Sequence, residues 1–280
     1  MQIGLEADLL IEDAASRHRE RRSIWRYCAL AFGITWGVGG LSLIVSARFS
    51  GFRLSRANPL LYLASAGPSI AGLVMTARTH GRRAVGRLLA RAIPRLSSLH
   101  WYSLVIVVYF AARLIIAWVI GTAAPAKLAH PASLLYLVLL TLLTDPGPLG
   151  EEFGWRGFAL PRLLRLRPPF VSAIMLGAVW ALWHLPAFFI PTLSQSRLSF
   201  PIFVLNSISL SVIMTWLYLR TRGDLFLMIL VHTMANTRAG DFDIPFTAEV
   251  IAEVLCAAVI IAAGGFRQAP RPVDPFSSKA

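Results

Sequence analysis

The stretch GEEFGWRGFALPRL, residues 150–163, places two adjacent carboxylates and an arginine in a chain that is 56% hydrophobic. Residues 21–144 contain no Asp or Glu. On a helix, Glu152 and Arg156 are four residues apart, share a face and can pair. Glu151 lies about 100° around the axis, with no obvious local partner. Such charges in a bilayer mark a functional site by default, and the plainer alternative is an interfacial pair that closes a helix end.

The composition indicates an integral membrane protein. The 280 residues have a mean hydropathy of +0.63 and only 15% charged side chains, whereas soluble domains have about 25%. Lys and Arg number 27 against 14 Asp and Glu, a net charge of +13. In a soluble protein that excess would suggest nucleic acid. Here the arginines fall between apolar runs, so we expect them to set topology and contact anionic lipid headgroups, with no nucleic-acid partner.

Eight apolar runs approach the roughly 20 residues that a membrane-spanning helix needs. They cover residues 24–45, 59–77, 99–121, 131 to beyond 151, 170–190, 200–219, 225–239 and 245–263. The seventh is short. The sequence therefore predicts an all-α fold, a polytopic membrane helix bundle of about eight transmembrane helices.

Three further segments complete the predicted organisation. Residues 1–23 form a cytoplasmic N-terminal segment ahead of one transmembrane domain at 24–265, whose first helix is retained and not cleaved as a signal. Residues 81–94 set apolar residues at helical spacing against arginines, which predicts an amphipathic helix on the membrane interface. Residues 266–280, rich in proline and serine, form a disordered cytoplasmic tail.

Arginine placement predicts the orientation. Arginines concentrate in the N-terminal segment, in the second, fourth and sixth connections and in the tail, and the intervening connections are poorer. The first connection breaks this contrast, with Arg48, Arg53 and Arg56. By the positive-inside rule both termini lie in the cytoplasm, which places the protein in the plasma membrane with N-in and C-in topology.

Two more polar pairs lie in apolar segments. Trp180 and His184 share one helix face, as do His232 and Asn236. A single histidine in a membrane helix often only hydrogen-bonds a neighbouring helix. Together these groups suit amide hydrolysis, which needs a base, an orienting partner and donors to the developing oxyanion. Glu151 with His184 can supply the first two, and His232 with Asn236 the last.

Arg113 and the cysteines receive no catalytic role. Arg113 lies near the middle of its predicted span, where it either snorkels to the interface or pairs with Asp145. Cys28 and Cys256 sit in apolar runs without metal-ligand spacing, so we expect no disulfide between them.

The polar pairs form three motifs in order along the chain. They are Glu151-Glu152-x-x-x-Arg156, Trp180-x-x-x-His184 and His232-x-x-x-Asn236. This set resembles the motifs of the CPBP intramembrane proteases, which include the type II CAAX prenyl endopeptidases and proteins linked to bacteriocin processing and self-immunity. The likeness runs from 131 to 236, within a core that we place at about 131–239. The commonest second motif of the family begins with Phe, and Trp180 here keeps an aromatic wall.

The resemblance implies an endopeptidase that cleaves a membrane-associated or prenylated-type peptide within the bilayer. In that reading Glu151 and His184 activate the water, and His232 and Asn236 stabilise the oxyanion. Glu152, Arg156 and Trp180 would lie behind these four side chains and support them without contacting the substrate. We expect the four catalytic side chains to converge on one pocket.

The resemblance also bears on metal. The family was long described as metalloproteases, and its best-supported mechanism is a metal-free glutamate protease. The sequence lacks the His-Glu-x-x-His pair of zinc proteases. We therefore expect no cofactor. The alternative is zinc held by Glu151, His184 and His232.

Two other classes of function stay open at this point. A catalytically idle member of the same fold could act as an immunity or scaffold protein. A proton-coupled transporter could use Glu151 and the histidines as a relay, although no symmetric pair of broken helices supports it.

Overall fold

The computed structural model describes residues 2–48, 59–122, 131–237 and 244–267, and within these ranges the secondary structure is entirely helical. The α-helices are α1 (Gln2–Arg48), α2 (Pro59–Ser65), α3 (Gly67–His80), α4 (Arg82–Ala90), α5 (Leu99–Val119), α6 (Pro131–Thr144), α7 (Pro146–Gly154), α8 (Leu160–Leu166), α9 (Pro169–Trp183), α10 (Phe200–Arg220), α11 (Leu225–Asn236) and α12 (Phe246–Ala262). The predicted all-α fold class is confirmed.

Several of these helices are long and apolar enough to cross a bilayer. Among the described residues four segments qualify, namely Ala14–Val45, Leu96–Val119, Pro169–Phe189 and Phe200–Arg220. The α2 and α3 pair, bent by 51°, adds a fifth if it forms one span. Helix α11 has 12 residues and α12 has 17. The protein is thus a polytopic membrane helix bundle, and the predicted count of eight spans stays a prediction.

Helix α4 is the amphipathic helix predicted within residues 81–94. Ala84 and Leu88 are buried on one side, whereas Arg82, Arg83 and Arg87 are exposed. Its placement on the membrane surface remains a prediction.

Close contact between α3 and α7 fixes the centre of the bundle. Gly150 and Gly154 are four residues apart, and both face the α2–α3 segment without a side chain between the backbones. A Cβ on Gly154 would lie 2.2 Å from the carbonyl oxygen of Pro68, and one on Gly150 would lie 2.7 Å from that of Ser65. Small residues at this spacing let membrane helices approach closely. The two glutamates between these glycines are therefore held inside the protein.

The predicted span that starts at residue 131 is interrupted at Asp145, between α6 and α7. The Asp145 carboxylate accepts a hydrogen bond from the backbone N–H of Gly147 at 2.8 Å, and Pro146 follows it at the first helical position. This is a helix N-cap with a proline at N1. A π-helical turn, Trp155–Ala159, then joins α7 to α8 just ahead of Pro161.

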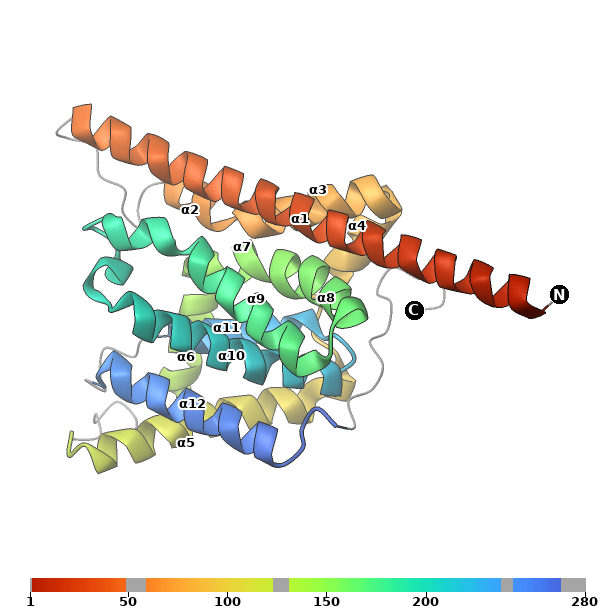
Figure 1. Cartoon of the computed structure of the whole chain (residues 1–280). Coiled ribbons are helices and arrows are strands. Elements are labelled where there is room, and N and C mark those ends of the chain that lie inside the picture. Colours follow the sequence, from red (N-terminus) through yellow and green to blue (C-terminus); the bar gives the residue numbers. More distant parts are fainter. Residues whose placement is uncertain (1, 49–58, 123–130, 238–243, 268–280) are drawn as a thin grey trace.

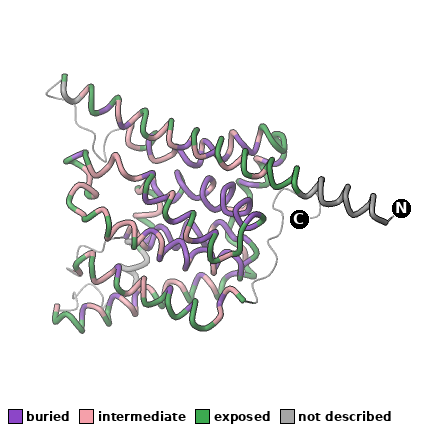
Figure 2. The backbone as a smooth tube through the Cα atoms, in the orientation of Figure 1, coloured by how far each residue is buried: buried purple, intermediate pink, exposed green. Residues whose placement is uncertain are grey.

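Burial follows the position of each helix in the bundle. Figure 1 shows α7, α8 and α11 near the middle, with α1, α5 and α12 along the outside, and Figure 2 shows buried residues gathered at the centre. Outward-facing apolar side chains remain exposed, among them Trp25 and Trp118 at 76% and 82%. A membrane protein exposes such residues to lipid.

Helix α1 runs without a break across residue 24, the predicted end of the N-terminal segment. Glu20 of that segment pairs with Arg162 and Arg165 of α8, so the N-terminal segment contacts the bundle. Cys28 and Cys256 are both free thiols, as predicted. Residues 268–280 of the predicted disordered tail lie outside the described residues.

Candidate active site

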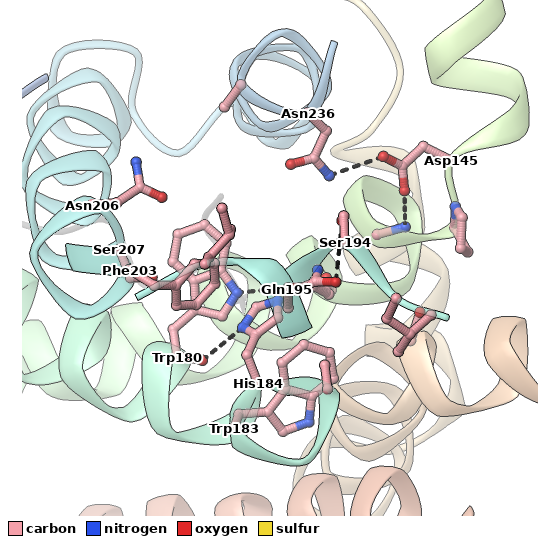
Figure 3. A pocket seen from close by; sticks show the side chains of 18 of the residues that line it. Asp145, Trp180, Trp183, His184, Ser194, Gln195, Phe203, Asn206, Ser207 and Asn236 are labelled. Carbon is pink, nitrogen blue, oxygen red and sulfur yellow. Dashed lines mark hydrogen bonds between the residues drawn. The ribbon is translucent and has the colours of Figure 1, made fainter. Parts of the chain in front are cut away.

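A cavity of about 230 Å³ lies among α7, α9, α10, α11 and α12. All four side chains predicted to be catalytic line it, namely Glu151, His184, His232 and Asn236. Figure 3 shows the cavity from close by, with Trp180 and His184 on one side and Asn236 and Asp145 on another. The predicted convergence on one pocket is confirmed. The chemical role of each side chain stays a prediction.

Glu151 receives its hydrogen bond from another helix. The indole Nε1 of Trp180 donates to Oε2 of Glu151 at 2.6 Å, and Glu151 is only 3% exposed. The sequence had suggested that Trp180 only preserves an aromatic wall in place of Phe. That interpretation is incomplete, because Phe has no N–H and could not make this bond.

His184 is held in one tautomer. Its Nδ1 lies 2.9 Å from the carbonyl oxygen of Trp180, which can only accept, so Nδ1 carries the hydrogen. In the neutral ring Nε2 then keeps a lone pair. The rings of Trp183 and Phe203 pack edge to face against the imidazole, at centroid distances of 4.6 and 5.0 Å. The Nε2 atom of His184 is therefore the one that can accept a hydrogen bond or a proton.

Glu152 accepts from two partners. Arg156 Nη1 and His232 Nδ1 each lie 2.8 Å from its Oε1, and the glutamate and arginine side chains are fully buried. The predicted Glu152–Arg156 pair is thus confirmed. Arg156 also lies over the ring of Trp180, at 4.4 Å from the centroid. These contacts join α7, α9 and α11 beneath the cavity.

The contact with Glu152 restricts what His232 can do. Because Nδ1 donates to the carboxylate, a neutral ring has no second N–H, and Nε2 can donate only when the ring is an imidazolium. Glu152 provides the counter-charge for that form. The predicted donor role of His232 therefore depends on Glu152.

Asn236 is oriented by a residue to which the sequence assigned no part in the site. Its Nδ2 donates to Oδ2 of Asp145 at 3.0 Å, and the other oxygen of Asp145 caps α7. Asp145 thereby connects the helix of Glu151 to the side chain of Asn236. The Asp-Pro pair at 145–146 is a helix-start signal that could have revealed it.

Arg113 does not form the Asp145 pair that the sequence allowed. Its Nη2 lies 2.6 Å from Oε1 of Glu249 in α12. Asp145 instead caps α7 and binds Asn236, whereas Glu249 lies on α12, which contacts α5.

Two acidic residues of α12 were missed by the sequence analysis. Glu249 and Glu253 line the cavity beside Asn206 of α10, and the amide of Asn206 donates to Glu253. Both are carboxylates in an apolar run, the same signal that singled out Glu151.

A metal fits these side chains poorly. Zinc needs three or four N, O or S ligands in close geometry. In the part of the chain that the structure describes, no group of three or more His, Cys, Asp or Glu side chains has an arrangement that could hold a metal ion. The predicted alternative of zinc on Glu151, His184 and His232 lacks that arrangement, and we derive no step through a metal.

Comparison with known proteins finds similarity over part of the chain. Residues 131–238 match the family model of the type II CAAX prenyl endopeptidases, Rce1-like. Over these residues the chain is similar to the CPBP/CAAX protease family. It is also 33% identical over 92 residues to CAAX prenyl protease 2 of Methanococcus maripaludis. That match covers 31% of this chain and 34% of the relative, so the chain spans about a third of the relative's length.

The family match covers one part of the cavity and leaves out another. The four predicted catalytic residues and Asp145 fall within residues 131–238. Glu253, and Glu249 with its partner Arg113, fall outside that range. The family comparison therefore covers the α7, α9 and α11 side of the cavity, and it does not cover the α12 side.

Proposed function

We propose that the protein is an intramembrane endopeptidase that hydrolyses a peptide bond of a membrane-associated or prenylated peptide. One observation carries the proposal. Glu151, His184, His232 and Asn236, from three helices far apart in sequence, line a single cavity inside a membrane helix bundle.

The chemistry begins with a water molecule between Glu151 and His184. Glu151 accepts a proton from the water while His184 orients it, and the oxygen bonds to the carbonyl carbon of the peptide. The negative charge that develops on the carbonyl oxygen faces His232 and Asn236. When the C–N bond breaks, the proton held by Glu151 passes to the leaving nitrogen, which leaves as an amine. The products are a carboxylic acid and an amine.

The remaining side chains keep these groups in place. Trp180 donates to Glu151, and Glu152 with Arg156 holds His232. Asp145 fixes one N–H of the Asn236 amide, which leaves the second for the substrate. Oriented groups of this kind remove the need for reorganisation during the reaction.

We further propose that the reaction needs no cofactor and that the protein resides in the plasma membrane with both termini in the cytoplasm. Its partners would be a peptide or protein substrate within the membrane and anionic lipid headgroups. The arginine distribution and the apolar helices support this arrangement.

A turnover assay tests the function directly. The purified protein in detergent should release the tripeptide from an internally quenched farnesylated peptide that ends in Cys-aliphatic-aliphatic-X. Glu151→Gln keeps the shape of the side chain and removes the base, so it should abolish turnover without changing the melting temperature. Exhaustive chelation followed by elemental analysis should leave the rate unchanged and find no stoichiometric zinc.

The assay also decides between the proposal and its alternatives. Cleavage that survives in Glu151→Gln would contradict the assigned base. A wild-type protein that binds the peptide without cleaving it would instead favour an immunity or scaffold protein. Proton-coupled uptake by the protein in liposomes, lost in Glu151→Gln, would favour a transporter.

A further inference from the structure

The α12 side of the cavity carries a second set of polar groups that the proposed hydrolysis does not use. Glu249 and Glu253 lie one turn apart on α12, and Asn206 of α10 lines the cavity next to them. Figure 3 shows Asn206 on the side of the cavity away from Asp145. A peptide that occupies the cavity would therefore extend from the Glu151 side towards this wall.

The two α12 carboxylates differ in how their charge is balanced. Glu249 pairs with Arg113 of α5 at 2.6 Å, and Arg113 is itself buried, with its guanidinium 4.9 Å from the centroid of the Tyr109 ring. Glu253 accepts from the neutral amide of Asn206. Among the described residues no Lys, Arg or His pairs with Glu253.

This difference points to a ligand. An ionisable side chain in a membrane helix is costly, and it is expected to face a cavity and to have a partner. A carboxylate has about four acceptor positions, of which the Asn206 amide uses one. Glu253 lines the cavity with acceptor positions free. An N–H group of the substrate can therefore donate a hydrogen bond to it.

We propose that Glu253, held in place by Asn206, forms a subsite for the cationic side chain of a lysine or arginine in the peptide substrate. Glu249 does not serve this purpose because Arg113 already neutralises it. The subsite rests on the proposed function, since it assumes that a peptide occupies the cavity. It selects among substrates and takes no part in bond cleavage.

Binding is measured first, on a protein that cannot cleave. Acetylated, fluorescently labelled farnesyl peptides carry Lys, norleucine or Gln at each position flanking the scissile bond, and they bind the Glu151→Gln protein in detergent. At one position Lys should bind at least about tenfold more tightly than norleucine, as expected for a charge-assisted hydrogen bond. Adding Glu253→Gln should remove this preference while norleucine binding changes less than about twofold. Glu253→Asp keeps the charge and should retain the preference.

The outcomes separate the subsite from the hydrolysis. Equal binding of the Lys and norleucine peptides at every position would overturn the subsite. An equal loss of affinity for the Lys and norleucine peptides in Glu253→Gln would also overturn it, because that result would indicate a structural role for Glu253. Cleavage is scored separately on the protein with Glu151 intact. A preference for the Lys peptide without cleavage supports the subsite and contradicts the hydrolysis. Cleavage without any preference supports the hydrolysis and contradicts the subsite.

Discussion

Trp180 touches several of the groups on which the proposed chemistry depends. Its N–H donates to Glu151, its ring lies 5.2 Å from that of His232, and the Arg156 guanidinium lies over its face. Its own carbonyl oxygen fixes the tautomer of His184. Of these contacts, the bond to Glu151 alone requires an indole, because a phenyl ring could keep the packing.

Trp180→Phe therefore separates packing from hydrogen bonding. The Glu151 carboxylate would lose a donor that orients it, and hydrogen bonds to charged groups contribute about 1.5 to 3 kcal/mol. We expect kcat for the quenched peptide to fall about ten- to a hundredfold while the melting temperature changes little. Trp183→Phe is the matched control, because the Trp183 N–H has no hydrogen-bond partner among the described residues. A kcat unchanged in Trp180→Phe would show that the bond to Glu151 does not matter.

Glu152→Gln should act on stability more than its neighbour Glu151→Gln does. Removing the charge leaves Arg156 and the facing His232 without their shared counter-charge in a fully buried site. Breaking one partner of a buried ion pair costs about 3 to 5 kcal/mol. Thermal melting in detergent should show a strong destabilisation or poor recovery of the protein. A stable, inactive Glu152→Gln beside an active Glu151→Gln would reverse the two roles.

The residue pairs show which contacts a sequence can predict. Glu152 and Arg156 are four residues apart on one helix, so helical geometry alone predicted them. Trp180 and Glu151 are 29 residues apart, and the Asp145–Asn236 bond spans 91 residues. Pairs of this kind depend on how helices pack, which no local spacing encodes. The sequence analysis suggested the wrong partner for Arg113, Asp145, for the same reason. Its observed partner, Glu249, lies 136 residues away along the chain.

At the scale of elements, α7 is positioned by its glycines. Gly150 and Gly154 let the backbone of α7 approach the α2–α3 segment, and the helix held there places Glu151 at the cavity. The small-x-x-x-small spacing was present in the printed sequence, in the same stretch as the glutamates. The interruption at Asp145 was also encoded, through its capping side chain and the two prolines at 146 and 148. Both features are missed when an apolar segment is judged only by its length.

Gly154→Ala tests this packing. The new methyl group would lie 2.2 Å from the carbonyl oxygen of Pro68, so the two helices must separate. Overpacking costs about 1 to 3 kcal/mol, and the displaced glutamates should lower turnover as well. Gly37→Ala in α1 is the matched control, since nothing lies within 4 Å of a Cβ there and alanine favours a helix. Equal melting temperatures for the two variants would rule out the backbone contact as the cause.

At the scale of the whole molecule, the connections sort into two groups. Figure 1 shows α4, the end of α8 and the end of α10 at one end of the bundle, opposite the segment between α9 and α10. The first three are the arginine-rich connections of the sequence, and Arg165 and Arg222 there are exposed. Among the described residues, these arginine-rich connections share one end of the bundle, opposite the arginine-poor segment between α9 and α10. The direction in which the bundle sits in the membrane follows from the positive-inside rule alone.

Cysteine labelling tests that direction. In a background carrying Cys28→Ser and Cys256→Ser, one variant carries Arg165→Cys in α8 and another carries Ser194→Cys in the segment between α9 and α10. Both positions are exposed, and Figure 1 shows the end of α8 and that segment at opposite ends of the bundle. A membrane-impermeant maleimide added to intact cells should label position 194 at once, and position 165 only after permeabilisation. The expected difference follows because the basic end stays in the cytoplasm, where positive charges are retained during insertion. Strong labelling of position 165 in intact cells, with position 194 protected, would contradict the predicted orientation and support the inverted topology.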